Sequence, residues 1–297
     1  MSFTEFMQHL ANGISVGSLY ALIAIGYTMV YGILRLINFA HGDIFMLGAY
    51  LSYYIVAYTS LPWYLAFVAA AVLTGIIGLL LERLAYRPLR DARRITVMIS
   101  AIGASFFLQN FATVVFGGRP KAFPVPPILN RIVNIGGVSI NVITFIIPAI
   151  TIALLIILTY FINKTKTGMA MRASSTNYET ARLMGINVDR VISITFFIGS
   201  FLAAIGGIMW GTKYPQLMPL MGAMPGIKCF IAAVIGGIGN ISGAVLGGFI
   251  LGLGEILLVA FLPSLTGYRD AFAFVLLIVI LLVKPTGLLG EKATEKV

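Results

Sequence analysis

Long stretches of this sequence carry no charged side chain, and most are long enough to cross a lipid bilayer as a helix. A helix needs about 20 apolar residues to span about 30 Å of hydrocarbon. The uncharged stretches cover residues 6–34, 44–81, 95–118, 132–163, 191–212, 229–254 and 271–283. The sequence therefore predicts an all-α polytopic membrane protein.

Composition supports this class and disfavours others. Only 10% of the 297 residues are charged, against about a quarter in soluble domains. The apolar content is too high for a disordered chain, and the net positive charge lies in loops between apolar runs, which disfavours nucleic-acid binding. The single cysteine, Cys229, excludes an intrachain disulfide and a cysteine-built metal site.

Two of the stretches require more than one helix each. The stretch 44–81 is too long for one crossing and contains Pro62-Trp63, so we divide it into spans at 44–60 and 62–81. Residues 229–262 contain one charge, Glu255, and as one helix would extend about 50 Å. We expect a break there, among the glycines around Asn240. The count becomes about 8 to 9 transmembrane helices, with at least one Gly-rich broken helix.

Basic residues set the expected orientation. Lys and Arg cluster in 82–94 and 163–190, and basic loops mark the cytoplasmic side. The Pro-rich loop 117–131 between them is then outside, and counting back places the N-terminus outside. We expect one transmembrane permease domain over 1–297 in a bacterial inner membrane, with a cytoplasmic segment at 163–190.

Polar residues within the apolar spans are candidates for a substrate path. Asn38, His41 and Asp43 form a dense polar group between two apolar helices. They line a pathway or, alternatively, form an interfacial turn in which His41 and Asp43 cap the next helix. One histidine and one carboxylate do not complete a metal coordination shell, so no metal site is expected.

The expected break near Asn240 is a second candidate. Non-helical backbone at membrane depth is tolerated where it lines a watery cavity, so Gly237, Gly239 and Asn240 are candidate path residues. The alternative is that the glycines there allow close helix packing. Glu255 is a candidate because a charged group in a membrane is costly, and pairing with Arg269 is the structural alternative.

Catalytic and nucleotide-binding motifs are missing or lack their context. The G-x-S-x-G pattern at 13–17 lies in an apolar helix rather than in a strand-turn-helix unit, so we interpret its small residues as a helix contact. No G-x-x-x-x-G-K-[ST] sequence occurs. We therefore expect no enzyme activity and no cofactor bound by this chain.

The basic segment 164–190 is longer than a link between two spans requires. Residues 176–184 suit a short surface helix that ends at Gly185. A solvated loop is the alternative interpretation.

Glu179-Thr180-Ala181, followed after three residues by Gly185, resembles the E-A-A-x-x-x-G coupling motif of ABC importer permeases, with Thr180 in place of an alanine. Further matching segments are 17–22, 26–32, 37–43, 82–90, 168–173, 185–187 and 284–290.

These segments are distributed along essentially the whole chain, which resembles the LivH-type permease subunits of branched-chain amino acid ABC importers. The resemblance implies a second related permease, two cytoplasmic ATP-binding subunits that use the ATP, and an external solute-binding protein. It also implies that Glu179, Ala181, Gly185 and Ile186 contact an ATP-binding subunit. The open alternatives are a related permease for urea or short amides, and an ion-coupled carrier or channel that uses Glu255.

Overall fold

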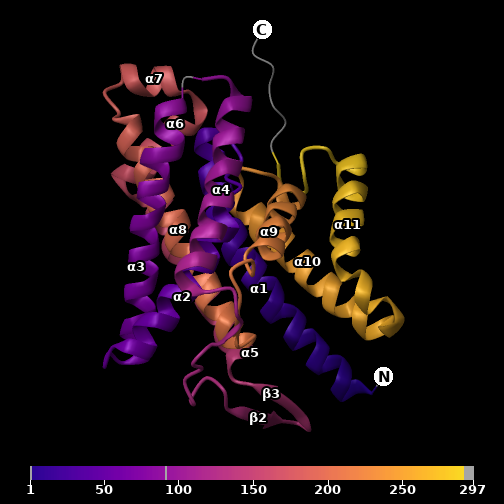
Figure 1. Cartoon of the computed structure of the whole chain (residues 1–297). Helices are drawn as coiled ribbons and strands as arrows, with labels where there is room; N and C mark the ends of the chain where they lie inside the picture. Colours follow the sequence, from indigo (N-terminus) through magenta and orange to yellow (C-terminus); the bar gives the residue numbers. More distant parts are fainter. Residues whose placement is uncertain (1, 91, 291–297) are drawn as a thin grey trace.

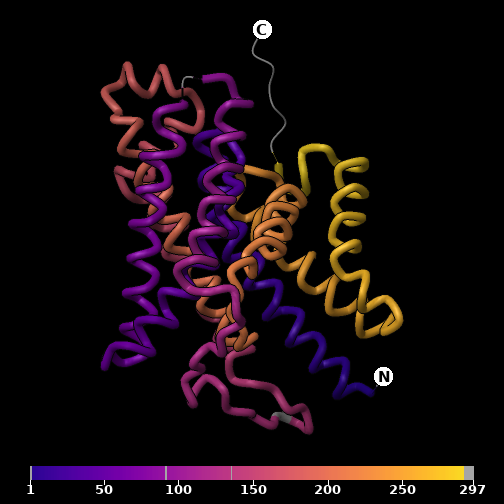
Figure 2. Tube along the Cα trace, in the orientation of Figure 1, coloured from indigo at the N-terminus to yellow at the C-terminus, as the bar shows by residue number. Residues whose placement is uncertain are grey.

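The computed structural model describes residues 2–90 and 92–290, which form a helical bundle with a small β-hairpin at one end (Figure 1, Figure 2). The last residues of the expected domain, 291–297, lie outside this part. The α-helices are α1 (Phe3–Leu34), α2 (His41–Tyr58), α3 (Trp63–Leu81), α4 (Arg94–Phe116), α5 (Ile143–Lys164), α6 (Lys166–Thr176), α7 (Tyr178–Leu183), α8 (Val188–Lys213), α9 (Ala223–Gly236), α10 (Ile241–Phe261) and α11 (Arg269–Val283).

The membrane-spanning class is confirmed by the lengths of these helices. Within the described residues, seven helices are long and apolar enough to cross a membrane. The 18-residue α2 and the 14-residue α9 are further helices of the bundle, so the expected 8 to 9 spans agree approximately. The division at Pro62-Trp63 is confirmed, because α2 ends at Tyr58 and α3 begins at Trp63 after Pro62.

Helix α1 forms the centre of the bundle and is buried over most of its length. It packs closely on α10, because the backbone of Gly17 lies directly against Gly252, and Gly248 lies against Ala21. Gly13 likewise faces Leu253 of α10. The G-x-S-x-G pattern is therefore a helix contact, as the sequence predicts, and its small residues let the two backbones approach.

The two ends of the bundle carry different structures. Helices α6 and α7 lie at one end, and the N-terminus lies at the other together with strands β2 (Ile132–Ile135) and β3 (Val138–Asn141) (Figure 1). The expected orientation requires α6 and α7 to lie at the opposite end from the N-terminus, as they do; which end is cytoplasmic stays a prediction.

The stretch 132–163 is not one helical span, which corrects the sequence interpretation. Its first ten residues form the β2–β3 hairpin, with Ile132 opposite Asn141 and Ile135 opposite Val138. Gly136 and Gly137 connect the strands with φ values of +59° and +84°, as a two-residue hairpin turn requires. A second pair of short strands, β1 (Lys121–Ala122) and β4 (Gln216–Leu217), joins two loops.

The expected break in 229–262 is confirmed. Helix α9 ends at Gly236 and α10 begins at Ile241, and φ is +108° at Gly237 and +97° at Gly239. The Asn240 side chain accepts a hydrogen bond from the Gly243 amide at 3.0 Å, which caps α10. The break is thus a turn between two neighbouring helices.

Candidate functional site

The segment between α5 and α8 folds into the two short helices α6 and α7. Asn177 begins α7, because its side-chain oxygen accepts a hydrogen bond from the Thr180 amide at 3.1 Å. At the other end, Gly185 has a φ of +80°. The amides of Gly185 and Ile186 donate to the carbonyls of Arg182 and Ala181, each at 3.0 Å. This pair of bonds is the Schellman ending, so the short surface helix ended by Gly185 is confirmed.

Helix α7 lies at the tip of the molecule (Figure 1), and its end exposes apolar side chains. Leu183 is 87% exposed and Met184 is 79% exposed, and Glu179 is exposed as well. Ala181 instead lies buried against the body of the chain, and Ile186 is half-buried. The contact of Glu179, Ala181, Gly185 and Ile186 with a partner stays a prediction, and the structure adds Leu183 and Met184 as the exposed apolar residues.

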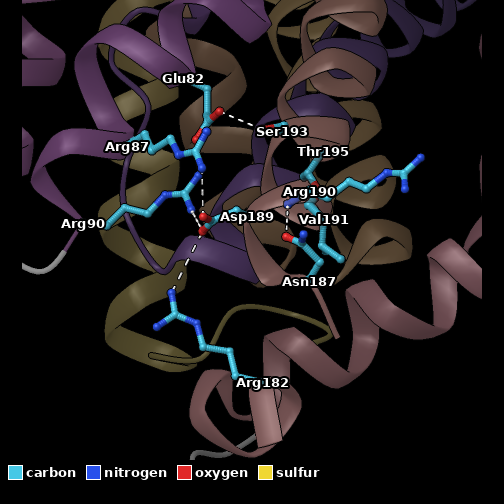
Figure 3. A network of polar contacts seen from close by, with 10 residues as sticks. All are labelled: Glu82, Arg87, Arg90, Arg182, Asn187, Asp189, Arg190, Val191, Ser193 and Thr195. Atoms are coloured by element: carbon cyan, nitrogen blue, oxygen red, sulfur yellow. Dashed lines mark hydrogen bonds and ion pairs between the residues drawn. The ribbon is translucent and has the colours of Figure 1, made fainter. Parts of the chain in front are cut away.

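A charged network connects this segment to the end of α3 (Figure 3). Asp189, in the first turn of α8, accepts hydrogen bonds from Arg87 at 3.0 Å and from Arg90 at 2.6 Å. Arg90 also pairs with Glu82, which is fully buried and accepts a hydrogen bond from Ser193 at 2.8 Å. The network therefore joins residues 82–90, which follow α3, to the start of α8.

A second connection joins the same segment to α1. The Tyr178 hydroxyl donates a hydrogen bond to the carbonyl oxygen of Ile33, and Arg35 contacts the Ser175 carbonyl at 3.5 Å. Burial raises the pKa of Tyr178 to about 12, so its hydroxyl stays protonated and remains a donor at neutral pH. A movement of α6 and α7 would thus be transmitted to the end of α1.

The turn at Asn240 lines a large cavity. This cavity has a volume of about 740 Å³ and lies among the ends of α1 and α5, helix α6 and the α9–α10 turn. Gly239, Asn240, Arg35 and Arg172 line it, and Gly237 does not. A side chain on Gly237 would collide with the backbone of Gly290, so this glycine serves the packing of the turn. The role of Gly237, Gly239 and Asn240 in a path stays a prediction.

Asn38, His41 and Asp43 do not form one cluster. Asn38 accepts a hydrogen bond from Tyr86 at 2.8 Å, and His41 Nε2 lies 3.1 Å from the Ile23 carbonyl oxygen. Asp43 lies in the first turn of α2 and accepts hydrogen bonds from side chains of α4. The proposed turn therefore exists, but the expected capping is wrong: α2 has no side-chain cap, and the three side chains bind different parts of the bundle.

Sequence reasoning missed the partners of Asp43. They are Ser105, with Oγ at 2.5 Å, and Gln109, with Nε2 at 3.0 Å. Both are polar residues of α4, and their spacing of four residues places them on one face of that helix. This spacing is the signal in the sequence that points to them.

Glu255 is fully buried and paired with cations. Its carboxylate lies 2.8 Å from Lys228 Nζ and 3.8 Å from an Arg269 nitrogen, and it accepts a hydrogen bond from Tyr20 at 3.1 Å. Lys228 also pairs with Asp270 at 2.7 Å. The structural alternative of pairing with Arg269 is confirmed, and Lys228 is a partner that the sequence did not indicate.

Among residues 2–90 and 92–290 there is no group of three or more His, Cys, Asp or Glu side chains that could hold a metal ion. The candidate sites are therefore a surface for a partner at α7 and cavities between the helices.

Comparison with known proteins places the chain in a family. Residues 9–281 match the family described as "Branched-chain amino acid transport system / permease component". The chain is 44% identical to the high-affinity branched-chain amino acid transport system permease protein LivH of Escherichia coli K12, over 99% of each chain. It is 42% identical to the permease protein BraD of a system with the same description in Pseudomonas aeruginosa, over 99% of this chain and 98% of that one.

A solved structure has a similar fold. PsaBC from Streptococcus pneumoniae in complex with Fab superimposes with a TM-score of 0.52 at 12% sequence identity, over 94% of this chain and 92% of that one. At this identity the likeness concerns the fold alone. The family match and the full-length relatives decide the assignment: this multi-pass membrane protein belongs to the family of permease components of branched-chain amino acid transport systems.

Proposed function

We propose that this chain is the membrane-spanning subunit of an ATP-driven importer that carries leucine, isoleucine and valine. Its similarity to LivH and BraD over the whole chain supports the substrate class. The observation that carries the coupling is the exposed apolar end of α7, which is joined to the body of the chain by the Tyr178 hydrogen bond to Ile33 and by the ion pair of Arg182 with Asp189 at 4.0 Å. An exposed apolar tip on a fixed support is suited to contact with another protein.

The proposed importer needs further subunits. The sequence has no P-loop, so ATP would be bound and hydrolysed by two cytoplasmic ATP-binding subunits, one of which would contact α7. A second related permease would complete the path, and an external solute-binding protein would deliver the amino acid to the side of the β2–β3 hairpin. This chain would itself be no enzyme.

The mechanism follows from the connections of α7. Closure of the ATP-binding subunits would displace α6 and α7 as a unit. Asp189 would transmit the displacement to Arg87 and Arg90, and so to α3, while Tyr178 would transmit it to α1. Because α1 is the centre of the bundle, its movement would change the packing of the helices on both of its sides. The path would then open in turn to the two ends of the bundle.

The alternatives are not favoured. An ion-coupled carrier needs a carboxylate that gains and loses its ion, whereas Glu255 is held by Lys228 and Arg269. A permease for urea or short amides is disfavoured by the identity of 44% to LivH over the whole chain.

The test is solute accumulation in cells that carry the complete importer. Radiolabelled leucine, isoleucine, valine, urea and acetamide would be offered separately to this strain and to a matched strain that lacks only this chain. We expect the strain with the complete importer to accumulate the three amino acids and neither urea nor acetamide. In the matched strain, the accumulation of the three amino acids by this importer should be absent. Accumulation of urea or acetamide without the amino acids would contradict the proposed substrate class.

A further inference from the structure

A small cavity lies between α1, α2, α4 and α9, apart from the large cavity at the α9–α10 turn. Its volume is about 230 Å³. Most of its wall is apolar and is contributed chiefly by Tyr27, Phe39, Ile102, Phe106, Ile227 and Phe230. One side is polar, where Asp43, Ser105 and Gln109 line the cavity together. The cavity thus has a polar part and an apolar part.

Asp43 is the charged group of this cavity, and none of the residues that the structure describes supplies its counter-charge. Its side chain is buried, with the residue 3% exposed, and it accepts hydrogen bonds from Ser105 and Gln109. Within the part of the chain that the structure describes, no Lys, Arg or His nitrogen lies within ion-pair distance of it.

The other buried carboxylates differ from Asp43 in this respect. Glu82 and Glu255 are both fully buried, and each is paired with at least one cation of the chain. A carboxylate at membrane depth is costly unless a cation accompanies it. Asp43 is therefore the buried acid whose cation would have to come from a ligand.

The apolar wall restricts the rest of such a ligand. Ile102 and Phe106 of α4 and Ile227 and Phe230 of α9 all line the cavity, so an aliphatic group would be buried among aliphatic and aromatic side chains. The α2 and α9 helices both begin at this cavity, at His41 and Ala223, and neither has a side-chain cap. Uncapped helix N-termini favour a nearby carboxylate.

We propose that this cavity is the site at which the permease holds its solute during passage, with the ammonium group of an aliphatic α-amino acid on the Asp43 carboxylate. Ser105 and Gln109 orient that carboxylate through their hydrogen bonds. The aliphatic side chain of the solute lies against Ile102, Phe106 and Ile227. This assignment rests on the proposed function, because it concerns the same solute.

The experiment uses the complete importer in proteoliposomes, with a cysteine in place of Ile102. Ile102 lines the cavity and is 40% exposed, while Cys229 is fully buried. Ile99→Cys is the matched control, because Ile99 is the same residue type on the same helix, is 66% exposed and does not line the cavity. Each variant is treated with a cationic aminoethyl and an anionic sulfonatoethyl methanethiosulfonate, with and without leucine.

For Ile102→Cys we measure the ratio of the modification rate with the cationic reagent to the rate with the anionic reagent. We expect this ratio to be about tenfold higher with Asp43 present than in the same protein carrying Asp43→Asn, because the carboxylate attracts the cation in a site of low dielectric. Leucine supplied with binding protein and ATP should slow the modification at Ile102→Cys and leave that at Ile99→Cys unchanged. Co-purification of all subunits with each variant shows that the complexes are assembled.

The proposed site is overturned if Ile102→Cys reacts with neither reagent, if Asp43→Asn leaves the reagent preference unchanged, or if leucine gives no protection while leucine uptake continues. In these cases the importer still carries leucine, and the proposed function stands. If the importer without these substitutions accumulates none of the amino acids, the proposed function fails and this site with it.

Discussion

At the scale of single residues, Gly185 determines how α7 ends. Its φ of +80° lies in the left-handed region, and no atom lies within 4 Å of the position that a side chain would take. A substitution there is therefore opposed by backbone conformation alone. Gly185 and Ile186 together close the helix end, so a change at Gly185 redirects the chain between α7 and α8.

The prediction is that Gly185→Val weakens the binding of the ATP-binding subunits and reduces uptake. A β-branched side chain in the left-handed region costs about 1 to 2 kcal/mol, and the end of α7 is displaced as a result. Gly185→Asn should behave almost as the natural protein, because asparagine tolerates this region. Co-purification of the ATP-binding subunits is the measurement, and equal recovery with Gly185→Val would contradict the role of this helix end.

Glu255 is the second residue whose role can be tested alone. Because Glu255 is fully buried between Lys228 and Arg269, Glu255→Ala removes the buried partner of Lys228 and leaves it only the more exposed Asp270, so it should destabilise the protein by on the order of 3 kcal/mol. The thermal unfolding midpoint in detergent measures this loss.

Asp270→Asn is the control for Glu255→Ala. This substitution removes the charge of Asp270, the second partner of Lys228. The Asp270 side chain is 56% exposed, so the unfolding midpoint should change little. A Glu255→Ala protein with an unchanged midpoint and lost uptake would instead favour a transport role for Glu255.

At the scale of elements, Asp189 makes the ion pairs between the start of α8 and the segment that follows α3. This residue contacts Arg87 and Arg90, and Arg90 continues the network to the buried Glu82. Asp189→Asn keeps the shape of the side chain and removes its charge. We expect ATP hydrolysis to persist while the amount of leucine carried per ATP falls about fivefold or more, which corresponds to the loss of a typical coupling energy.

The control for Asp189→Asn is Arg190→Gln, at the next position. The Arg190 side chain is exposed and makes no ion pair with the residues that the structure describes. It should leave the ratio of transport to hydrolysis unchanged. Equal ratios in the two variants would mean that the network holds the helices together without transmitting movement.

The sequence predicted those elements whose cause is local. The division at Pro62, the end of α7 at Gly185 and the break near Asn240 each follow from residues at that position. The β2–β3 hairpin was missed because its valines and isoleucines have the same apolar character as a span. The pair Gly136-Gly137, which suits a two-residue hairpin turn, was the local signal that distinguishes a hairpin from a helical span.

The contacts between distant elements were not predictable in the same way. Lys228 meets Glu255 only because α9 and α10 lie side by side, and Ser105 meets Asp43 only because α4 packs beside the start of α2. The sequence alone identifies polar residues in apolar helices, and these residues are candidates for a functional site. It does not give their partners, which depend on how the helices are packed.

At the scale of the whole molecule, the chain has two different ends joined by one central helix. The end with α6 and α7 carries the proposed ATPase contact, and the opposite end carries the β2–β3 hairpin and the N-terminus (Figure 1). Helix α1 connects them, since it is linked to α7 through Tyr178 and passes beside both the small and the large cavity. The proposed importer therefore takes up energy at one end and solute at the other.

The most direct test of this account is leucine uptake into proteoliposomes that contain the complete importer, with binding protein outside and ATP either inside or absent. Only importers whose α6–α7 end faces the interior can use enclosed ATP. We predict uptake when ATP is enclosed and none without it, whatever ion gradient is applied. Uptake driven by a proton or sodium gradient in the absence of ATP would contradict the account.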